Sequence, residues 1–371
     1  MPASLPLAGL KVLDLTRVLA GPLCTMTLGD LGALVLKVER PGVGDETRGW
    51  GPPFDADGAS AYFLSVNRNK LSIALDLDSE LDRDLLLRLA READVVVENL
   101  RPGTLERRGI EPARLLAASP RLVWCRLTGF GAESTRLGYD VVVQAESGWM
   151  AITGEPQGAP MKIGVALADV CAGKDAAIAI LSCLGARDRL GPADRMITVS
   201  LAHSATAALV NVAQNALVTG REPARWGNAH PNLVPYQLFE ASDRPFILAV
   251  GNDAQWLGCC RALERHDLAA DPRFLRNAGR VEHREELIRT LSETLRTRIA
   301  ADWLERLERC GVPAGIVRRV MEALADVQAD AKTGIAPPAP GAVHRPPPRL
   351  DQHGPLVREL GWGAFGRALS P

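Results

Sequence analysis

The chain has 371 residues, of which 47% are hydrophobic and 23% charged, proportions typical of a globular protein and not of a disordered one. Its length exceeds the size at which one hydrophobic core usually stops growing, so we expect two domains. With 43 basic and 44 acidic side chains, the overall charge favours neither nucleic acid nor a membrane surface as a partner, and an anionic ligand requires a local cluster.

The first 130 residues alternate short β-branched runs with helical patterns, such as those at 22–31 and 79–91. This alternation predicts an α/β fold with a mostly parallel sheet covered on both faces. Ligands of such sheets bind where strands end and loops begin. The strands expected from the pattern are 12–15, 34–38, 72–76, 95–98 and 122–126.

Beyond residue 140 the pattern is helical, with one strand-like insert at 195–200, and a turn-rich linker at 221–231 leads into a smaller domain. We expect domains at 1–220 and 221–325, and a return of 326–371 to the first domain with a proline-rich tail. The smaller domain is expected to contain strands at 245–250 and 313–317 and helices at 255–263, 284–295 and 301–309.

Cysteine usage and the N-terminal sequence indicate a cytoplasmic protein. The seven cysteines are odd in number, scattered and without C-x-x-C spacing, which argues against a disulfide framework and a zinc site. The first residues lack the pattern of a signal peptide. The uncharged stretch 198–220 has the length of a membrane span but carries several polar residues, so we interpret it as a buried or subunit-interface helix and expect no membrane association.

Asp169 is the only charged residue between Lys162 and Lys174, and its neighbours are apolar or small. A carboxylate among such residues loses water and becomes a stronger base and nucleophile. The alternative is a helix cap, because residues 170–184 read as a helix and Asp is a favoured N-cap residue. On spacing alone the cap is the commoner role.

Basic residues recur next to the expected strands. Arg17 and Arg40 follow the first two, Arg68 and Lys70 precede the third, and Arg101 follows the fourth. In a parallel sheet several of them can cluster at one edge and hold a phosphorylated ligand, although scattered solvated side chains explain the pattern equally well. The common nucleotide, hydrolase and zinc-protease motifs are missing from the sequence.

Several sequence blocks occur in the order typical of one known family: 7–15, 19–22, 31–33, 37–42, 67–70, 98–103, 138–140 and 168–169. With them the chain resembles the family III CoA-transferases, which include formyl-CoA transferase and carnitine CoA-transferase. The blocks 50–54, 62–70, 225–227, 234–237 and 251–252 are most similar to the succinate-hydroxymethylglutarate CoA-transferase branch. The resemblance therefore implies dicarboxylic acids as substrates.

The resemblance also implies a fold, a reaction and a site. The fold is a large Rossmann-like open parallel-sheet domain with a smaller α+β domain, in an interlocked homodimer. The reaction moves CoA from an acyl-CoA such as succinyl-CoA to a carboxylic acid through a covalent intermediate on Asp169, with the CoA thioester as substrate and no permanently bound cofactor. The residues implied to contact CoA or the acyl group are Leu19, Ala20, Arg40, Lys70, Asn99, Leu100, Arg101, Arg107 and Tyr139.

Two alternatives remain open. Related enzymes of this fold isomerise 2-methylacyl-CoA thioesters with a His where this chain has Tyr139, which favours transfer. A non-catalytic acyl-CoA binding protein is the other alternative, because this chain departs from the family pattern at Leu71 and in a shortened region after Val327. A third departure is the reduced glycine loop at 251–255, which bears on water exclusion.

Overall fold

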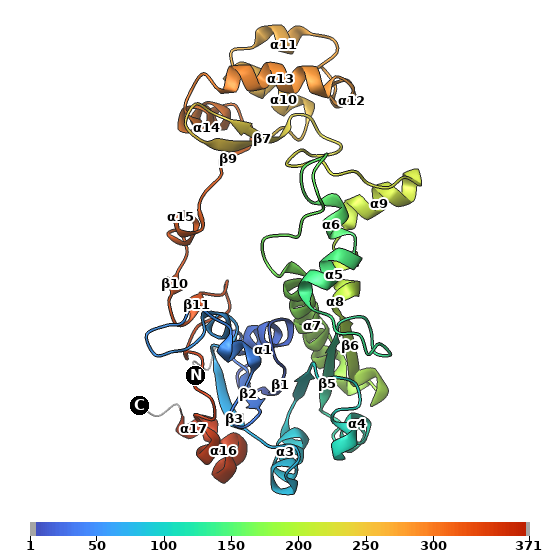
Figure 1. Cartoon of the computed structure of the whole chain (residues 1–371), viewed down its shortest axis with the longest axis vertical. Coiled ribbons are helices and arrows are strands. Elements are labelled where there is room, and N and C mark those ends of the chain that lie inside the picture. The colour runs from blue at the N-terminus through green and yellow to red at the C-terminus, as the bar shows by residue number, and fades with distance from the viewer. Residues whose placement is uncertain (1–4, 369–371) are drawn as a thin grey trace. The chain divides into compact units, whose positions relative to one another are not determined.

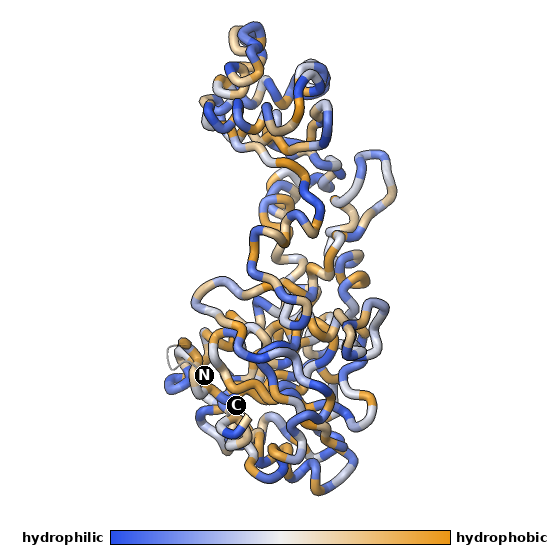
Figure 2. Tube along the Cα trace, turned by 90° about the vertical axis from the view of Figure 1, so that its left-hand side faces the viewer, coloured by the Kyte–Doolittle hydropathy of each residue, from blue (hydrophilic) through white to orange (hydrophobic). Residues whose placement is uncertain are grey.

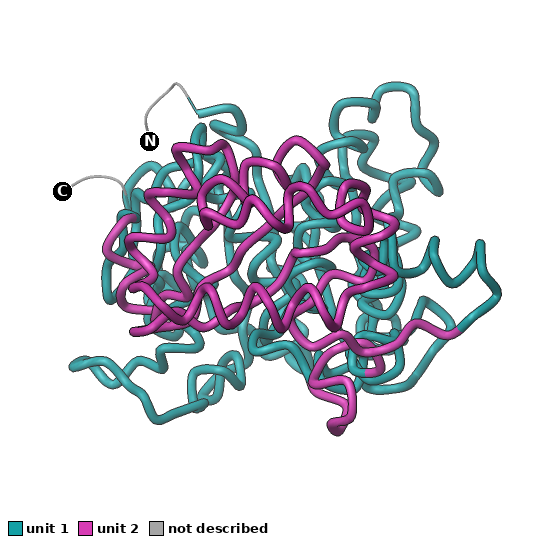
Figure 3. The backbone as a smooth tube through the Cα atoms, turned by 90° about the horizontal axis from the view of Figure 1, so that it is seen from above, with its two compact units in different colours: residues 1–150, 162–221, 327–371 teal, residues 151–161, 222–326 magenta. Residues whose placement is uncertain are grey.

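The computed structural model describes residues 5–368. It divides into two compact units (Figure 3). Unit 1 comprises residues 1–150, 162–221 and 327–371, and unit 2 comprises residues 151–161 and 222–326. The chain thus leaves unit 1 twice and returns to it for its last segment.

Unit 1 is built on a six-stranded sheet in the order β3-β2-β1-β4-β5-β6, in which every neighbouring pair is parallel (Figure 1). The strands are β1 (Lys11–Leu15), β2 (Leu34–Glu39), β3 (Lys70–Ala74), β4 (Val95–Glu98), β5 (Val123–Thr128) and β6 (Met196–Ser200). The strand order reverses between β1 and β4, which is where open α/β sheets bind ligands. The predicted parallel α/β architecture is confirmed.

Alternate strand residues supply the two faces of this sheet. Leu13 and Trp124 pack on one face and Val12 and Cys125 on the other, all fully buried. Parallel strands are covered on both sides, so they read as continuous apolar runs. Figure 2 shows hydrophobic stretches of the chain alternating with hydrophilic ones. The first face is covered by α3 (Glu80–Glu92), α4 (Pro112–Ala118), α16 (Gly354–Leu360) and α17 (Ala364–Arg367), and the second by α1 (Ala20–Asp30), α5 (Asp140–Glu146), α7 (Leu167–Ala186) and α8 (Leu201–Ala207).

Three expected elements differ from the observed ones. The third strand begins at Lys70, so Lys70 is its first residue and does not precede it. The helix expected from residue 170 begins at Leu167. The stretch 198–220 is not one helix: it contains the end of β6, then α8 and α9 (Val210–Thr219), and no residue of α9 is buried. Among residues 5–368, no helix has the length and hydropathy of a membrane span.

The C-terminal segment covers the free edge of β3. The backbone N–H of Asn69 donates to the Arg345 carbonyl at 3.0 Å and that of His353 to the Ser72 carbonyl at 3.0 Å. The Asp351 carboxylate accepts from the Ala74 N–H at 2.7 Å. These bonds occupy backbone groups that an edge strand otherwise leaves open. The segment reaches this edge after the short pair β10 (Ala329–Asp330) and β11 (Gly334–Ile335).

Unit 2 has its own core around a three-stranded antiparallel sheet in the order β7-β8-β9. The buried side chain of Arg280 connects three segments of unit 2, because it donates hydrogen bonds to the carbonyls of Val234 and Phe274 and to the Asp253 carboxylate. Its strands are β7 (Tyr236–Glu240), β8 (Pro245–Ala249) and β9 (Ala314–Ile316). Its helices are α10 (Asp253–Ala262), α11 (His266–Ala270), α12 (Asn277–Glu282), α13 (Arg284–Leu295), α14 (Ala300–Arg309) and α15 (Val320–Leu324). The remaining α-helices of the described residues are the short α2 (Ala61–Leu64) in unit 1 and α6 (Trp149–Ile152), which spans residues of both units.

Candidate active site

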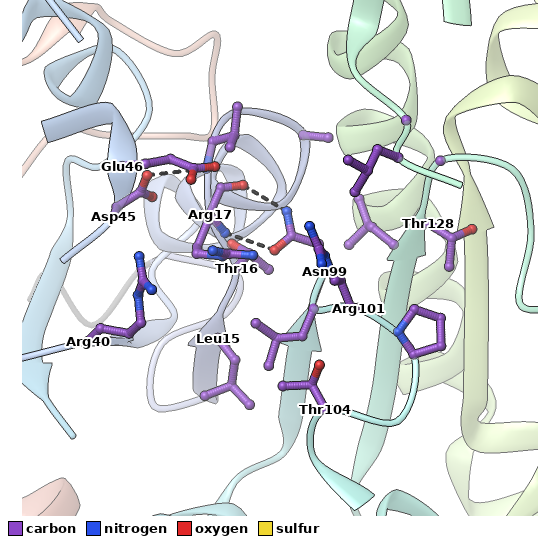
Figure 4. Close-up of a pocket in the computed structure, with 18 of the residues that line it drawn as sticks. Leu15, Thr16, Arg17, Arg40, Asp45, Glu46, Asn99, Arg101, Thr104 and Thr128 are labelled. Atoms are coloured by element: carbon purple, nitrogen blue, oxygen red, sulfur yellow. Dashed lines mark hydrogen bonds between the residues drawn. The ribbon is translucent and has the colours of Figure 1, made fainter. Parts of the chain in front are cut away.

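A pocket of about 820 Å³ lies within unit 1 at the carboxyl ends of the central strands (Figure 4). The loops after β1, β2, β3, β4 and β5 all contribute to its wall, as an open parallel sheet predicts. Eight of the residues expected at the site line it: Leu19, Ala20, Arg40, Asn99, Leu100, Arg101, Tyr139 and Asp169.

Asp169 lies in the first turn of α7 and is 8% exposed. Its interpretation as the helix cap is wrong, because the N-cap residue is Ala166. The methyl side chain of Ala166 accepts no hydrogen bond and so does not cap the helix. The capping group instead comes from another helix. The carboxylate of Asp140, at the start of α5, accepts from the backbone N–H of Ala168 at 2.8 Å and of Asp169 at 3.3 Å. The Asp169 side chain is therefore free for another role.

The surroundings of Asp169 raise its pKa to about 7. Burial is the larger cause and the negative charge of Asp140 the second. The positive end of the α7 dipole acts in the opposite direction and favours the carboxylate. A carboxyl group with this pKa exists in both protonation states near neutral pH, and its ionised form is more basic than a solvated Asp.

The packing of α7 on α1 fixes where Asp169 lies. Gly173 is one turn further along the same face of α7, and a Cβ there would lie 2.6 Å from the Ala20 carbonyl oxygen. Such a close approach requires glycine. It brings the start of α1, with Leu19 and Ala20, to the same pocket wall as Asp169.

Tyr62 was not expected at the site, yet it lies within electrostatic reach of Asp169. Burial, and then the charges of Asp169 and Asp140, raise the pKa of Tyr62 to about 12. Its ring packs edge to face against Trp50 with centroids 5.0 Å apart. The Trp50 loop is conspicuous in the sequence for its glycines and prolines, but nothing in the sequence indicates that it approaches residue 169.

The loop after β1 is held by polar contacts from two other loops. Asn99 accepts from the backbone N–H of Arg17 at 2.9 Å and donates to the Arg17 carbonyl at 2.7 Å (Figure 4). Asp45 accepts from the N–H of Val18 at 3.3 Å. Val18 has a φ of 71°, a conformation that a β-branched residue adopts only when its surroundings impose it. The loop is thus pre-shaped where it meets the pocket.

Arginine side chains give the pocket its capacity for anions. Within residues 5–368, the guanidinium groups of Arg40 and Arg101 have no ion pair, and both are exposed in the pocket wall. Arg108 also lines the pocket but is paired with Asp78 at 2.9 Å. Unpaired arginines beside a cavity are suited to phosphate groups.

Lys70 and Arg107 do not line this pocket. Lys70 is fully buried, and its ammonium lies 3.0 Å from the Asp14 carboxylate and 2.9 Å from the Asn67 side-chain oxygen. Burial lowers its pKa to about 8, against the attraction of Asp14. The cause of the discrepancy is strand direction: Lys70 begins β3, whereas the pocket lies where the strands end. Arg107 is exposed, and its neighbour Arg108 occupies the pocket wall.

Residues 7–355 match the family model of CoA-transferase family III. The chain belongs to this family. A succinyl-CoA:glutarate CoA-transferase of Mus musculus is 42% identical over 87% of this chain and 74% of that protein. A succinate–glutarate CoA-transferase of Agrobacterium fabrum is 40% identical over 94% of each chain. The predicted family and the prediction of a CoA-transferase enzyme are confirmed.

A solved structure shares the fold, and a further CoA-transferase is similar in sequence. A crystal structure of a CAIB/BAIF family protein from Brucella suis superposes with a TM-score of 0.83, at 40% identity, and covers 95% of this chain and 98% of that one. An acetyl-CoA:oxalate CoA-transferase of Acetobacter aceti is 41% identical over 86% of this chain and 82% of that protein. The named relatives therefore act on different short carboxylic acids at similar identity to this chain.

Proposed function

We propose that this CoA-transferase moves CoA from succinyl-CoA or another dicarboxylyl-CoA to a short carboxylic acid, with Asp169 as the covalent nucleophile. The observation that carries the proposal is the buried Asp169 carboxyl group in the wall of a pocket that also holds unpaired arginines. A CoA thioester combines a reactive carbonyl with several phosphates, so one such pocket can accept both ends of it. Glutarate is the first acceptor to try, because two of the relatives are named for it.

The chemistry is a series of acyl exchanges without ATP. An oxygen of the Asp169 carboxylate attacks the thioester carbonyl, the C–S bond breaks, and CoA leaves as its thiolate, giving a mixed anhydride. The thiolate attacks the aspartyl carbonyl of that anhydride, releasing the donor acid and forming an aspartyl-CoA thioester. The acceptor carboxylate repeats the two steps in reverse, and Asp169 returns as a carboxylate. Each intermediate keeps an activated acyl group.

The pocket residues divide by chemistry. Leu19, Ala20 and Leu100 contribute apolar side chains to the pocket wall, and Asn99 shapes the loop that carries Arg17. Arg40 and Arg101 are proposed to bind the nucleotide phosphates. Tyr139 stands directly before Asp140 and is proposed to face the acyl group, with its hydroxyl as a hydrogen-bond donor. Neither Lys70 nor Arg107 is assigned a contact with CoA.

Trapping of the intermediate tests the proposal. The protein is incubated with succinyl-CoA, treated with hydroxylamine or borohydride, and digested for mass spectrometry. We expect a modification at Asp169 and none in Asp169→Ala, which keeps its fold but loses activity by orders of magnitude. The control is Asp175→Asn, which removes an exposed carboxylate from the same helix and should leave trapping intact. Absence of modification with several acyl-CoAs would falsify the covalent role.

The alternative activities have their own assays. A 2-methylacyl-CoA isomerase exchanges the proton at carbon 2 with deuterium from D₂O, which a transferase does not. A non-catalytic binding protein binds CoA tightly but exchanges it with no carboxylate. Exchange between succinyl-CoA and labelled succinate without deuterium uptake excludes both.

We further propose that the chain works as an interlocked homodimer in the cytoplasm. The exposed apolar side chains of Val210, Leu217 and Val218 on α9 support an interface there, since large exposed apolar groups on one helix usually meet a partner. All seven cysteines are free, as in a reducing compartment. Light scattering should give a mass of two chains, and a monomer that is fully active would contradict the dimer.

A further inference from the structure

The start of α7 has a polar support that the sequence gives no hint of. Asp140 projects from the first turn of α5 to the backbone N–H groups of Ala168 and Asp169. Gln144, one turn further along α5 and fully buried, donates to the second Asp140 oxygen at 2.6 Å. Asp140 thus satisfies two helix-terminal donors that lack any cap from Ala166.

Gln144 also holds the chain segment that leads into α7. Its side-chain oxygen accepts from the N–H of Ile163 at 2.8 Å, and its nitrogen donates to the Val165 carbonyl at 3.2 Å. A single buried amide therefore joins α5, the 163–165 segment and Asp140. Buried networks with all members satisfied specify one arrangement of the groups they join.

We propose that Asp140 and Gln144 are positioning residues for Asp169: Asp140 replaces the missing helix cap and places a negative charge beside the nucleophile, while Gln144 fixes both Asp140 and the approach to the helix. The inference rests on the proposed role of Asp169 in CoA transfer. It assigns neither residue a contact with substrate.

Other charged or titratable groups near the start of α7 are less able to supply this charge. Tyr62 on α2 and Tyr139 are phenols, and Lys174 and Asp175 lie more than one turn further along α7 on exposed positions. The Asp169 pKa is raised by the charge of Asp140 and not by the charge of any of these four groups. Other titratable groups on the elements packed against α7 include Cys24 on α1, His203 on α8 and Cys171 on α7 itself. Glu146 on α5 and Arg126 on β5 are held in ion pairs with Arg136 and Glu98.

Asp140→Asn is the decisive variant because Asn keeps an oxygen for the Ala168 N–H but removes the charge. We expect the acid limb of kcat/KM for succinyl-CoA to move to lower pH, by about 1 on the pH scale. A role in packing alone predicts lower activity with an unmoved limb. The same shift should appear without turnover, as loss of the protonated Asp169 carboxyl band at lower pH in infrared difference spectra against Asp169→Ala.

Gln144→Leu separates the effect of the Asp140 charge from the effect of the Gln144 hydrogen bonds. It keeps the Asp140 charge but removes the hydrogen bonds to Ile163, Val165 and Asp140, so we expect kcat to fall about tenfold with no movement of the acid limb to lower pH. The matched control Asp175→Asn neutralises an exposed carboxylate on α7 and should change neither. Equal shifts for Asp175→Asn and Asp140→Asn would overturn the inference.

The outcomes distinguish this inference from the proposed function. If wild-type protein exchanges CoA and Asp169→Ala does not, but Asp140→Asn leaves both the pH profile and the infrared titration unchanged, the positioning role is wrong and the transfer mechanism stands. If Asp169→Ala exchanges CoA as fast as the wild-type protein does, the mechanism itself is wrong. In that case the infrared titration still measures whether Asp140 controls the ionisation of Asp169.

Discussion

Asn99 at the end of β4 binds both backbone groups of Arg17 at the end of β1, accepting from its N–H at 2.9 Å and donating to its carbonyl at 2.7 Å. β1 and β4 are the strands between which the sheet order reverses. One side chain therefore fixes the spacing of the two loops at the point where such sheets bind ligands.

Replacement of Asn99 by Ala should weaken CoA binding more than it weakens the fold. The loop after β1 contains Val18 in a strained conformation, which relaxes when its support is lost. We expect the Kd for CoA, measured by calorimetry, to rise about tenfold and the free energy of unfolding to fall by about 1–2 kcal/mol.

The matched control is Asn277→Ala in unit 2. Asn277 also bridges two backbone groups, the N–H of Val234 and the carbonyl of Asn232. Its loss should lower stability to a similar degree and leave CoA affinity intact. Similar losses of CoA affinity in the two variants would show that Asn99 acts through stability alone.

The sequence predicts much of unit 1 because its signals are local. Buried parallel strands are apolar on both faces, so the runs around Leu13, Val35 and Val96 stand out from their surroundings. Asp169 is conspicuous for the same reason, as a single charge among apolar residues. Both features depend only on near neighbours in the chain.

The remaining site features depend on contacts between distant residues. Asp140 caps α7 across 29 positions of the chain, and no local pattern announces that contact. The resemblance implies a CoA contact for both Lys70 and Arg40, but the two lie at opposite ends of their strands. Arg40 follows β2 into the pocket, whereas Lys70 begins β3 and is buried against Asp14. The expected strands already place Lys70 before the third strand, so strand direction argues against the CoA contact that the resemblance implies.

The pH dependence of transfer should report Asp169. Its carboxyl group must be ionised to attack, and its pKa lies at about 7. We therefore expect kcat/KM for succinyl-CoA to increase with pH, tenfold for each pH step of 1 well below the pKa, and to level off above about pH 8. This pH profile of kcat/KM is measured from initial rates of CoA exchange at constant ionic strength. An acid limb near the ordinary Asp value would contradict burial of the nucleophile in solution.

Arg40 and Arg101 should dominate the salt dependence of CoA binding, because neither guanidinium group has an ion pair among the described residues. Arg40→Gln or Arg101→Gln removes an attraction to phosphate without breaking an ion pair. We expect each to raise the Kd for CoA about tenfold and to flatten its dependence on salt. Arg91→Gln, an exposed change on α3, is the control. Unchanged affinity in both pocket variants would remove these residues from the phosphate site.

His353 should make the fold less stable in mild acid. Its ring nitrogen Nδ1 accepts from the Ser72 N–H at 3.2 Å at the edge of β3, so the neutral form is required. Burial, and then the charge of Arg345, lower its pKa from 6.5 to about 4. A depressed histidine pKa adds stability that is complete above 6.5 and lost as the pH falls toward 4. Urea unfolding across this range should show a smaller loss for His353→Gln than for wild-type protein, and equal losses would contradict the assignment.

Gly173→Ala tests whether close packing of α7 on α1 positions the nucleophile. A Cβ at this position would lie 2.6 Å from the Ala20 carbonyl oxygen, which is backbone and cannot rotate away. The two helices must therefore separate, which displaces Asp169, the residue one helical turn before Gly173. We expect a loss of about 1–3 kcal/mol in stability and a fall in kcat of about 100-fold. Gly185→Ala is the control on the same helix, with nothing within 4 Å of its Cβ. It should stabilise α7 by up to about 1 kcal/mol without changing kcat, and normal kcat in Gly173→Ala would show that the site tolerates movement of its helix.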